Sequence, residues 1–181
     1  IITVMVLEMK VPNGTDWAAL RPLAPVFLSY ALSFVFLGIY WNNHHHLLQA
    51  TRQVNGQTLW ANMHLLFWLS LIPFTTSWMG QTHFAAWPVA VYGVVLLLAA
   101  VGYFILAQGL VSLHGKDSAI AIALGRDFKG KVSLLVYVVA IPLSFLSPSL
   151  AFAMYVFVAV MWLVPDRRIE KVLAASGHAQ D

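Results

Sequence analysis

The amino-acid sequence predicts an all-α integral membrane protein. Of its 181 residues, 60% are hydrophobic and 9% are charged, whereas about 25% of the residues are charged in a soluble globular domain. The charges are also clustered, because no Asp, Glu, Lys or Arg occurs in residues 22–51, 53–115 or 132–165. A soluble surface requires more charges than this, and a disordered chain has low hydrophobicity, so we expect helices that cross a bilayer.

Six transmembrane helices follow from the uncharged stretches and from the breaks within them. The expected spans cover residues 1–11, 23–41, 58–79, 84–108, 132–146 and 150–164. The apolar run at residues 1–7 is about a third of the length that a bilayer core requires, so we expect the given chain to begin inside its first helix, which is therefore truncated. Pro12, Asn13 and Gly14 then end that helix.

The later spans are separated by turn residues. The string GQTH at residues 80–83 divides the longest uncharged stretch, and the string SPS at residues 147–149 divides the last one. Pro73 and Pro142 lie inside expected spans and predict kinks. The small residues around Gly93 and Gly102 predict close packing of the fourth helix against its neighbours.

The basic residues predict the orientation in the membrane. An even number of spans places both termini on the same side, and most of the ten Lys and Arg residues then fall on that side: Arg52, Lys116, Arg126, Lys129, Lys131, Arg167, Arg168 and Lys171. Lys10 and Arg21 alone fall on the other side. We therefore expect both termini to be cytoplasmic, with residues 1–165 forming a single transmembrane domain and residues 166–181 a cytoplasmic tail.

The residue types present exclude several kinds of chemistry. The interiors of the expected spans carry essentially no carboxylates or amines, which disfavours a proton relay or a charged pore. The absence of cysteine excludes disulfides, thiolate nucleophiles and Cys-ligated metals. We find no Gly-rich phosphate loop and no Ser/His/Asp set, so we predict no catalytic residues. The net charge of +3 is what membrane insertion alone requires, so the bilayer, and not nucleic acid, is the expected partner.

The string WNNHHH at residues 41–46 is the one histidine cluster. Consecutive residues on a helix turn by about 100°, so three adjacent histidines cannot converge on one ion, and metal pairs on helices prefer spacings of three or four. We therefore predict no metal site and expect hydrogen-bonded histidines at a helix end. Two alternatives stay open: a membrane haem or metal-binding redox protein that uses His44, His45, His46 and His64, and a non-conducting membrane scaffold.

Three strings carry a resemblance to a known family. They are ITVMVLE at residues 2–8, WNNHH at residues 41–45 and LIPFTT at residues 71–76. In their order and spacing they resemble the bacterial branch of the transmembrane protein 175 potassium-channel family. The similarity extends over residues 1–108, and beyond them the pattern of spans agrees.

This resemblance implies a homotetramer with six helices per subunit, whose first helices line a central pore. The function that it implies is passive, potassium-selective leak conduction across the bacterial inner membrane. Potassium ions would be the permeant ions, and no cofactor would be needed.

By position, the resemblance assigns the pore lining to Thr3, Val4 and Leu7, which share one helical stripe. Four copies of Leu or Val would form an apolar constriction, and four Thr hydroxyls would replace part of the ion's hydration shell. Glu8 either concentrates cations at the outer mouth or is a solvated helix end, and the sequence leaves both possibilities open.

The resemblance also assigns a supporting role to the end of the second helix. In relatives, hydrogen bonds from this end hold an Arg and a Phe-Ser-Asp string on the first helix. Trp41, Asn43 and His44 match the residues that make those bonds. We expect the motif that they hold to lie upstream of Ile1, whereas a form that begins at Ile1 would favour the scaffold.

Overall fold

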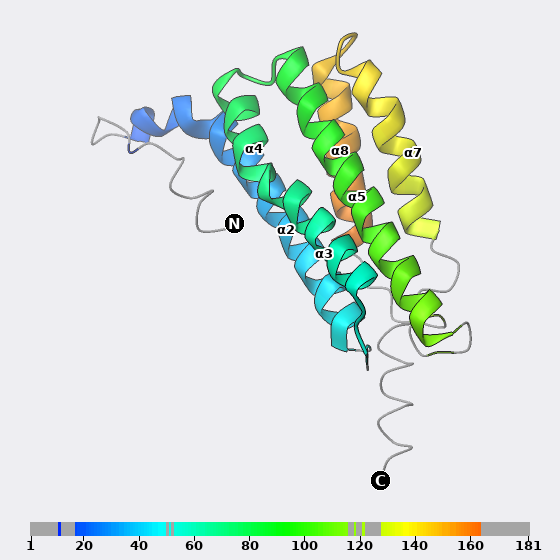
Figure 1. The fold of residues 1–181 in the computed structure, drawn as a ribbon. Coiled ribbons are helices and arrows are strands. Elements are labelled where there is room, and N and C mark those ends of the chain that lie inside the picture. The colour runs from blue at the N-terminus through cyan, green and yellow to red at the C-terminus, as the bar shows by residue number, and fades with distance from the viewer. Residues whose placement is uncertain are drawn as a thin grey trace.

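The described part of the chain is all-helical in this computed structural model (Figure 1). The structure describes residues 11, 17–49, 51, 53–115, 118, 121 and 128–163. Its elements are the 3₁₀ helix η1 (Trp17–Leu23) and the α-helices α2 (Ala24–Gln49), α3 (Gly56–Ser70), α4 (Ile72–Gln81), α5 (Ala86–His114), α7 (Phe128–Leu143) and α8 (Pro148–Leu163). These elements confirm the predicted all-α class.

The helices correspond to five of the six predicted spans when α3 and α4 are counted as one interrupted helix. Within the described residues, the segments Leu20–Gln49 and Ala86–His114 are each long and apolar enough to cross a membrane. α7 and α8 have 16 residues each, slightly fewer than the roughly 17–25 of a typical span. The first span (apart from Val11) and the tail at residues 166–181 lie outside the described residues, so the count of six remains a prediction.

Two predicted helix ends were wrong, because α2 and α5 both continue past them. α2 ends at Gln49 and not at residue 41, and α5 ends at His114 and not at residue 108. Residues 42–49 contain neither Gly nor Pro, and Leu47 among them is buried in the core. The polar side chains in this segment suit an aqueous surface, but burial of Leu47 favours continuing the helix.

The third span is interrupted at Leu71, where α3 gives way to α4. The Leu71 N–H donates to the Trp68 carbonyl at 3.2 Å, an i→i−3 bond that tightens the last turn of α3. Pro73 occupies the first turn of α4, where its missing N–H leaves the Leu69 carbonyl without its usual helical donor. The sequence predicts a kink at Pro73, and the structure has an interruption two residues earlier, at Leu71.

The two predicted turns are also confirmed. Between α4 and α5, His83 and Phe84 adopt positive φ angles of 50° and 59°, and the Thr82 hydroxyl donates to the Trp78 carbonyl at 2.7 Å. Between α7 and α8, the Ser147 N–H donates to the Leu143 carbonyl at 2.8 Å. Pro148 then begins α8 in the position where a helix tolerates proline best.

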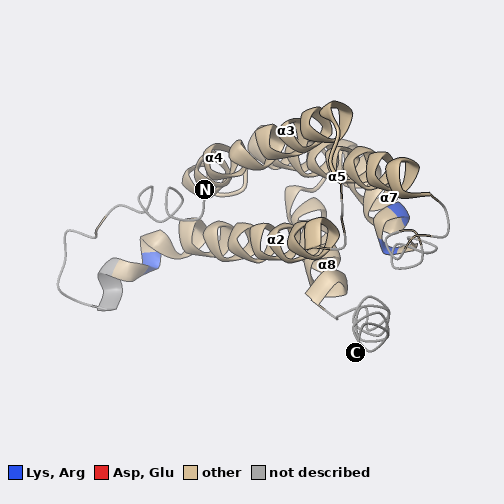
Figure 2. Cartoon of the chain, turned by 60° about the horizontal axis from the view of Figure 1, so that its bottom comes forward, with Lys and Arg blue, Asp and Glu red and all other residues tan. Residues whose placement is uncertain are grey.

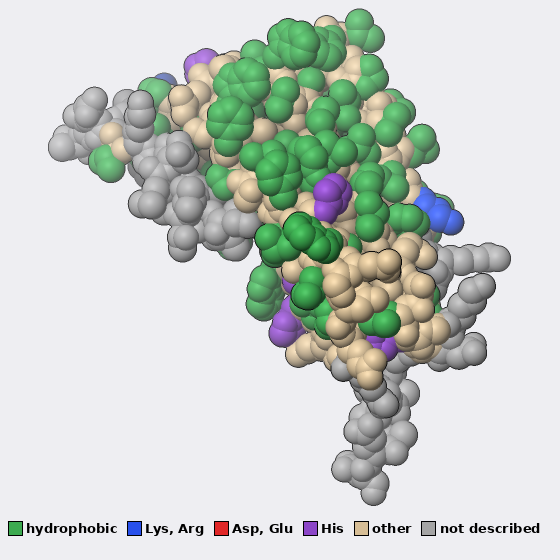
Figure 3. Space-filling model, viewed as in Figure 1, with side chains coloured by type: hydrophobic (Ala, Val, Ile, Leu, Met, Phe, Trp, Pro, Cys, Tyr) green, Lys and Arg blue, Asp and Glu red, His purple; other side chains and the backbone are tan. Residues whose placement is uncertain are grey.

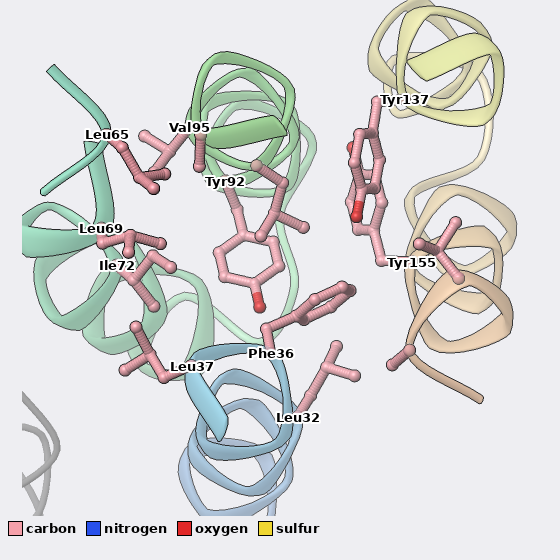
Figure 4. Close-up of a cluster of buried hydrophobic side chains, with 14 of the residues drawn as sticks. Leu32, Phe36, Leu37, Leu65, Leu69, Ile72, Tyr92, Val95, Tyr137 and Tyr155 are labelled. Atoms are coloured by element: carbon pink, nitrogen blue, oxygen red, sulfur yellow. The ribbon is translucent and has the colours of Figure 1, made fainter. Parts of the chain in front are cut away.

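α5 is the central helix of the bundle, with contacts to α3, α4, α7 and α8, and α2 packs on α4 and α8 (Figure 1). The core lies between these elements. Figure 4 shows Leu37 and Phe36 of α2, Leu65 of α3, Tyr92 of α5 and Tyr155 of α8 pointing into the same interior. All five side chains are almost completely buried.

Glycine permits the closest helix contacts. A Cβ added at Gly80 of α4 would lie 2.6 Å from Ser29 Oγ and 2.8 Å from Val26 Cα on α2. A Cβ at Gly93 would collide with the Tyr155 ring, and one at Gly102 would lie 3.1 Å from Leu65 Cα. The close approach predicted at Gly93 and Gly102 is confirmed, and Gly80 marks a third such contact.

The surface agrees with a membrane environment. Figure 3 shows one face covered largely by hydrophobic side chains, and Trp60, Phe74 and Trp87 are among the large apolar residues exposed on the chain. A patch this extensive would be unusual on a soluble monomer. The charged residues of the described part are Arg21 in η1 and Lys129 and Lys131 at the start of α7, at opposite ends of the bundle (Figures 1 and 2).

Candidate functional site

The predicted pore-lining residues Thr3, Val4 and Leu7, and Glu8 beside them, lie outside the described residues. The candidate site that the structure does describe is the C-terminal end of α2, which carries the three predicted supporting residues Trp41, Asn43 and His44. Their side chains have different surroundings.

His44 joins α2 to α3. Its Nε2 lies 2.6 Å from Oδ1 of Asn62, and the bond is partly buried. Because an amide oxygen can only accept, Nε2 carries the proton in this arrangement. In a neutral imidazole, Nδ1 is then an acceptor, so His44 has one nitrogen fixed by α3 and one that suits an N–H or O–H donor.

Asn62 is a residue of this site that the sequence did not indicate. It lies in the middle of α3, in a segment with no motif, and its position opposite His44 depends on how α3 packs on α5. No pattern of residue types in the sequence marks it.

Asn43 and Trp41 make mainly local contacts. The Asn43 Nδ2 donates to the Ile39 carbonyl one turn earlier on α2, at 2.9 Å. The Trp41 ring stacks on His45, with ring centroids 5.3 Å apart and planes within 5° of each other. Trp41 is 65% exposed, so its outer ring face is open to a neighbouring helix or to lipid.

Trp41 belongs to an exposed apolar stripe along α2. Phe27, Phe34, Trp41 and Leu48 recur every seven residues and all four are exposed. A seven-residue spacing keeps side chains on one face of a helix and is typical of a face that packs against another helix. We call this face the α2 stripe.

A buried hydroxyl cluster fixes the other side of α2. Ser33 Oγ lies 2.6 Å from Thr76 Oγ1 on α4 and 2.9 Å from Tyr92 Oη on α5. All three residues are buried. Thr76 is the last residue of the LIPFTT string, which the sequence indicated only through its resemblance, and Ser33 and Tyr92 carried no signal of their own. The cluster holds α2, α4 and α5 together and so positions the α2 stripe.

The histidines do not form a metal site in the part of the chain that the structure describes. No group of three or more His, Cys, Asp or Glu side chains is placed there to hold an ion. His44 is bonded to Asn62, and His64 Nε2 accepts from the Trp68 indole N–H at 3.0 Å. This arrangement does not favour the haem or metal-binding alternative built on His44, His45, His46 and His64.

Comparison with known proteins gives concordant results. Residues 1–73 match the family model described as endosomal/lysosomal potassium channel TMEM175. A protein named potassium channel from Chryseobacterium sp. (strain P1-3) is 51% identical over 173 residues, which cover 96% of this chain and 90% of that protein. A second protein named potassium channel, from Streptomyces collinus (strain DSM 40733 / Tue 365), is 27% identical over 175 residues, covering 89% of this chain and 84% of that protein.

The fold has a counterpart among solved structures. The crystal structure of a lysosomal potassium-selective channel TMEM175 homolog from Chamaesiphon minutus superimposes with a TM-score of 0.75 at 25% sequence identity. The match covers 90% of this chain and 88% of the other. Fold and sequence therefore point to one family.

Proposed function

The chain belongs to the TMEM175 potassium-channel family, and from this premise we infer that it conducts potassium ions passively across a membrane. The observation that carries the inference is the 51% identity to a potassium channel over nearly the whole chain. The family is one of ion channels, and the apolar, all-helical structure fits a membrane channel.

We propose that four copies of the chain assemble around a central pore. Membership of the TMEM175 family supports this proposal. Within each subunit, the α2 stripe is suited to receive another helix, because its exposed aromatic and aliphatic side chains recur at a spacing of seven. We propose the first helix as that partner, so that the α2 stripe holds the pore-lining helix against the rest of the subunit.

The proposed pore lining is Thr3, Val4 and Leu7. An apolar ring raises a barrier to ions by favouring dewetting, and hydroxyl oxygens lower that barrier by replacing part of the hydration shell. Such a pore has no strong cation site, so we expect slow conduction with a modest preference for potassium. Glu8 is proposed as a carboxylate at the outer mouth that raises the local cation concentration.

Trp41, Asn43 and His44 are proposed to support the pore helix from the end of α2. The His44 to Asn62 bond at 2.6 Å anchors the imidazole to α3 and fixes its protonation at Nε2. The remaining nitrogen then accepts from a donor on the first helix. For the cell, we propose the bacterial inner membrane, with both termini cytoplasmic.

Flux measurements test the channel. The full-length protein is reconstituted into potassium-loaded vesicles, and potassium efflux is followed after an electrical shunt is supplied. We expect efflux well above that of empty vesicles. Efflux equal to that of empty vesicles would rule out the channel and favour the scaffold alternative.

The pore assignment has its own test. Replacing Leu7 by Ser puts a hydroxyl in the constriction, so we expect sodium permeation to rise and the potassium-to-sodium ratio to fall severalfold. Leu163→Ser makes the same chemical change at an exposed position at the end of α8 and should leave the ratio unchanged. An unchanged ratio in both Leu7→Ser and Thr3→Ala would remove these residues from the pore.

A further inference from the structure

A cavity lies beside the start of α7 and the end of α8, against the middle of α2 and the middle of α5. It is a pocket of about 190 Å³. The apolar walls come from three helices, with Phe36 and Ile39 of α2, Ala100 and Phe104 of α5, and Leu134 and Tyr137 of α7. These six residues belong neither to the proposed pore nor to its support, but Asn43, one of the proposed supporting residues, also lines the pocket.

The size and lining of this pocket suit an apolar chain. An apolar cavity of roughly 150 Å³ holds a benzene-sized molecule, so this pocket has room for a segment of hydrocarbon but not for a hydrated headgroup. Phe104 is 45% exposed, which places one wall of the pocket at the outer surface of the bundle. A hydrocarbon chain in the surrounding bilayer can therefore reach it from the side.

Two of the polar side chains that line the pocket are hydrogen-bonded to each other. The Ser133 hydroxyl donates to the Lys129 carbonyl at 2.8 Å and accepts from the Trp162 indole N–H at 2.9 Å. Both Ser133 and Trp162 line the pocket, and these bonds engage the Ser133 hydroxyl and the Trp162 indole N–H within the protein itself.

The mouth of the pocket is basic. Lys131 lines it and is exposed. Lys129 lies one half-turn earlier, with its Nζ 5.9 Å from the centroid of the Trp162 ring. Figure 2 shows these two lysines together at the start of α7. Two ammonium groups beside an apolar pocket at the end of a membrane helix complement a lipid that combines an acyl chain with a negative phosphate.

We propose that this pocket binds an anionic phospholipid of the surrounding leaflet. One acyl chain enters between α2, α5 and α7, and the phosphate lies against Lys129 and Lys131. The two ammonium groups favour an anionic lipid over a zwitterionic one, because they would repel the positive choline or ethanolamine group of a zwitterionic lipid. The bound lipid would join the start of α7 to the lower half of α2, which carries Trp41 and His44.

Lipid binding can be measured whether or not the protein conducts, so this proposal and the channel function are tested separately. The full chain is purified and delipidated. It is then titrated with dioleoyl phosphatidylglycerol or with dioleoyl phosphatidylcholine, and the bound lipid is counted by native mass spectrometry. Glycerol phosphate serves as the headgroup without an acyl chain.

Two sets of variants test the contribution of the basic residues and that of the apolar pocket separately. Lys129→Gln with Lys131→Gln removes the basic mouth, and Arg21→Gln removes a basic residue at the opposite end of the bundle as the matched control. Ala100→Phe fills the pocket, and Ala153→Phe adds the same ring at an exposed position on α8. Ala100→Val, a smaller filler, is used if the phenylalanine variant does not yield folded protein.

We expect the native chain to bind phosphatidylglycerol at least roughly tenfold more tightly than phosphatidylcholine, with glycerol phosphate not bound. The double lysine variant should lose this preference, Ala100→Phe should weaken the binding of both lipids, and both controls should behave as the native chain. Equal affinity of the native chain for the two lipids would overturn the proposal. So would full phosphatidylglycerol binding after the pocket is filled, or a loss in Arg21→Gln as large as that in the double lysine variant.

Discussion

At the scale of single residues, Ser33 is where three helices share their buried polar contacts. Its hydroxyl is within 2.9 Å of both Thr76 Oγ1 and Tyr92 Oη. A hydroxyl in an apolar interior costs free energy unless it has a partner, and the three hydroxyls satisfy one another. Ser33 has both of the other hydroxyls as its partners, so its removal leaves two groups without this contact.

These shared hydrogen bonds predict which substitutions in the cluster destabilise the protein most. Ser33→Ala should lower the free energy of unfolding by about 1 kcal/mol, the usual size of such bonds between membrane helices. Tyr92→Phe removes only the hydrogen bond between Ser33 and Tyr92. It should therefore lower the free energy of unfolding by less than Ser33→Ala does. The measurement is the midpoint of thermal unfolding of the purified protein in detergent.

Ser70→Ala is the matched control for this prediction. The Ser70 hydroxyl is exposed and donates only to the Phe67 carbonyl of its own helix, at 2.7 Å, so its loss breaks no contact between helices. If Ser33→Ala and Ser70→Ala melt at the same temperature, the hydroxyl cluster does not stabilise the bundle.

The site residues show how far sequence reasoning reaches at this scale. Trp41, Asn43 and His44 could be grouped because they are adjacent in a recognisable string, and their joint role remains a prediction. Asn62 could not be found, since the residue that faces His44 is set by the packing of α3 on α5. Such an arrangement depends on the tertiary packing of several helices, and no local pattern in α3 encodes it.

At the scale of elements, the contact between α2 and α4 depends on Gly80. A methyl group there would lie 2.6 Å from Ser29 Oγ and 2.8 Å from Val26 Cα. The backbone of α2 is one of these two obstacles, and backbone atoms cannot turn away as a flexible side chain can. The two helices would have to separate to admit it, and the bonds of Ser33 to Thr76 and Tyr92 lie on the same face of α2.

We therefore expect Gly80→Ala to destabilise the protein by about 1–3 kcal/mol, the usual cost of overpacking. Gly109→Ala is the matched control, because a methyl group at Gly109 meets nothing within 4 Å, and alanine favours a helix more than glycine does. Thermal unfolding of both variants gives the comparison. A Gly80→Ala protein as stable as the control would show that α2 and α4 can separate without cost.

Breaks between helices could be predicted from the sequence where particular residues cause them, but the ends of α2 and α5 could not. Pro73 cannot donate a backbone hydrogen bond, and the turn at residues 80–83 combines Gly with polar residues, so both breaks follow from local chemistry. α2 continues to Gln49 because Leu47 is buried against other elements. The stabilisation from burying Leu47 exists only in the folded bundle, and the polar residues around Leu47 do not indicate it.

At the scale of the whole molecule, the charged residues mark the two ends of the bundle. Arg21 lies beside the start of α2, and Lys129 and Lys131 lie at the start of α7, at the opposite end (Figure 1). The same end holds the loop between α2 and α3, where the Gln53 N–H donates to His114 Nε2 at the end of α5, at 3.3 Å. The excess of basic residues on this side predicts that it faces the cytoplasm.

The orientation can be tested by labelling, because the sequence contains no cysteine and a single introduced thiol reacts without background. Gln81 and Ser149 are exposed near the two turns at one end, and Gln53 is exposed at the other. In intact bacteria that express each variant, a membrane-impermeant maleimide should label Gln81→Cys and Ser149→Cys but not Gln53→Cys. After permeabilisation all three should react. Labelling of Gln53→Cys alone in intact cells would invert the topology, and it would also place the proposed lipid site in the outer leaflet.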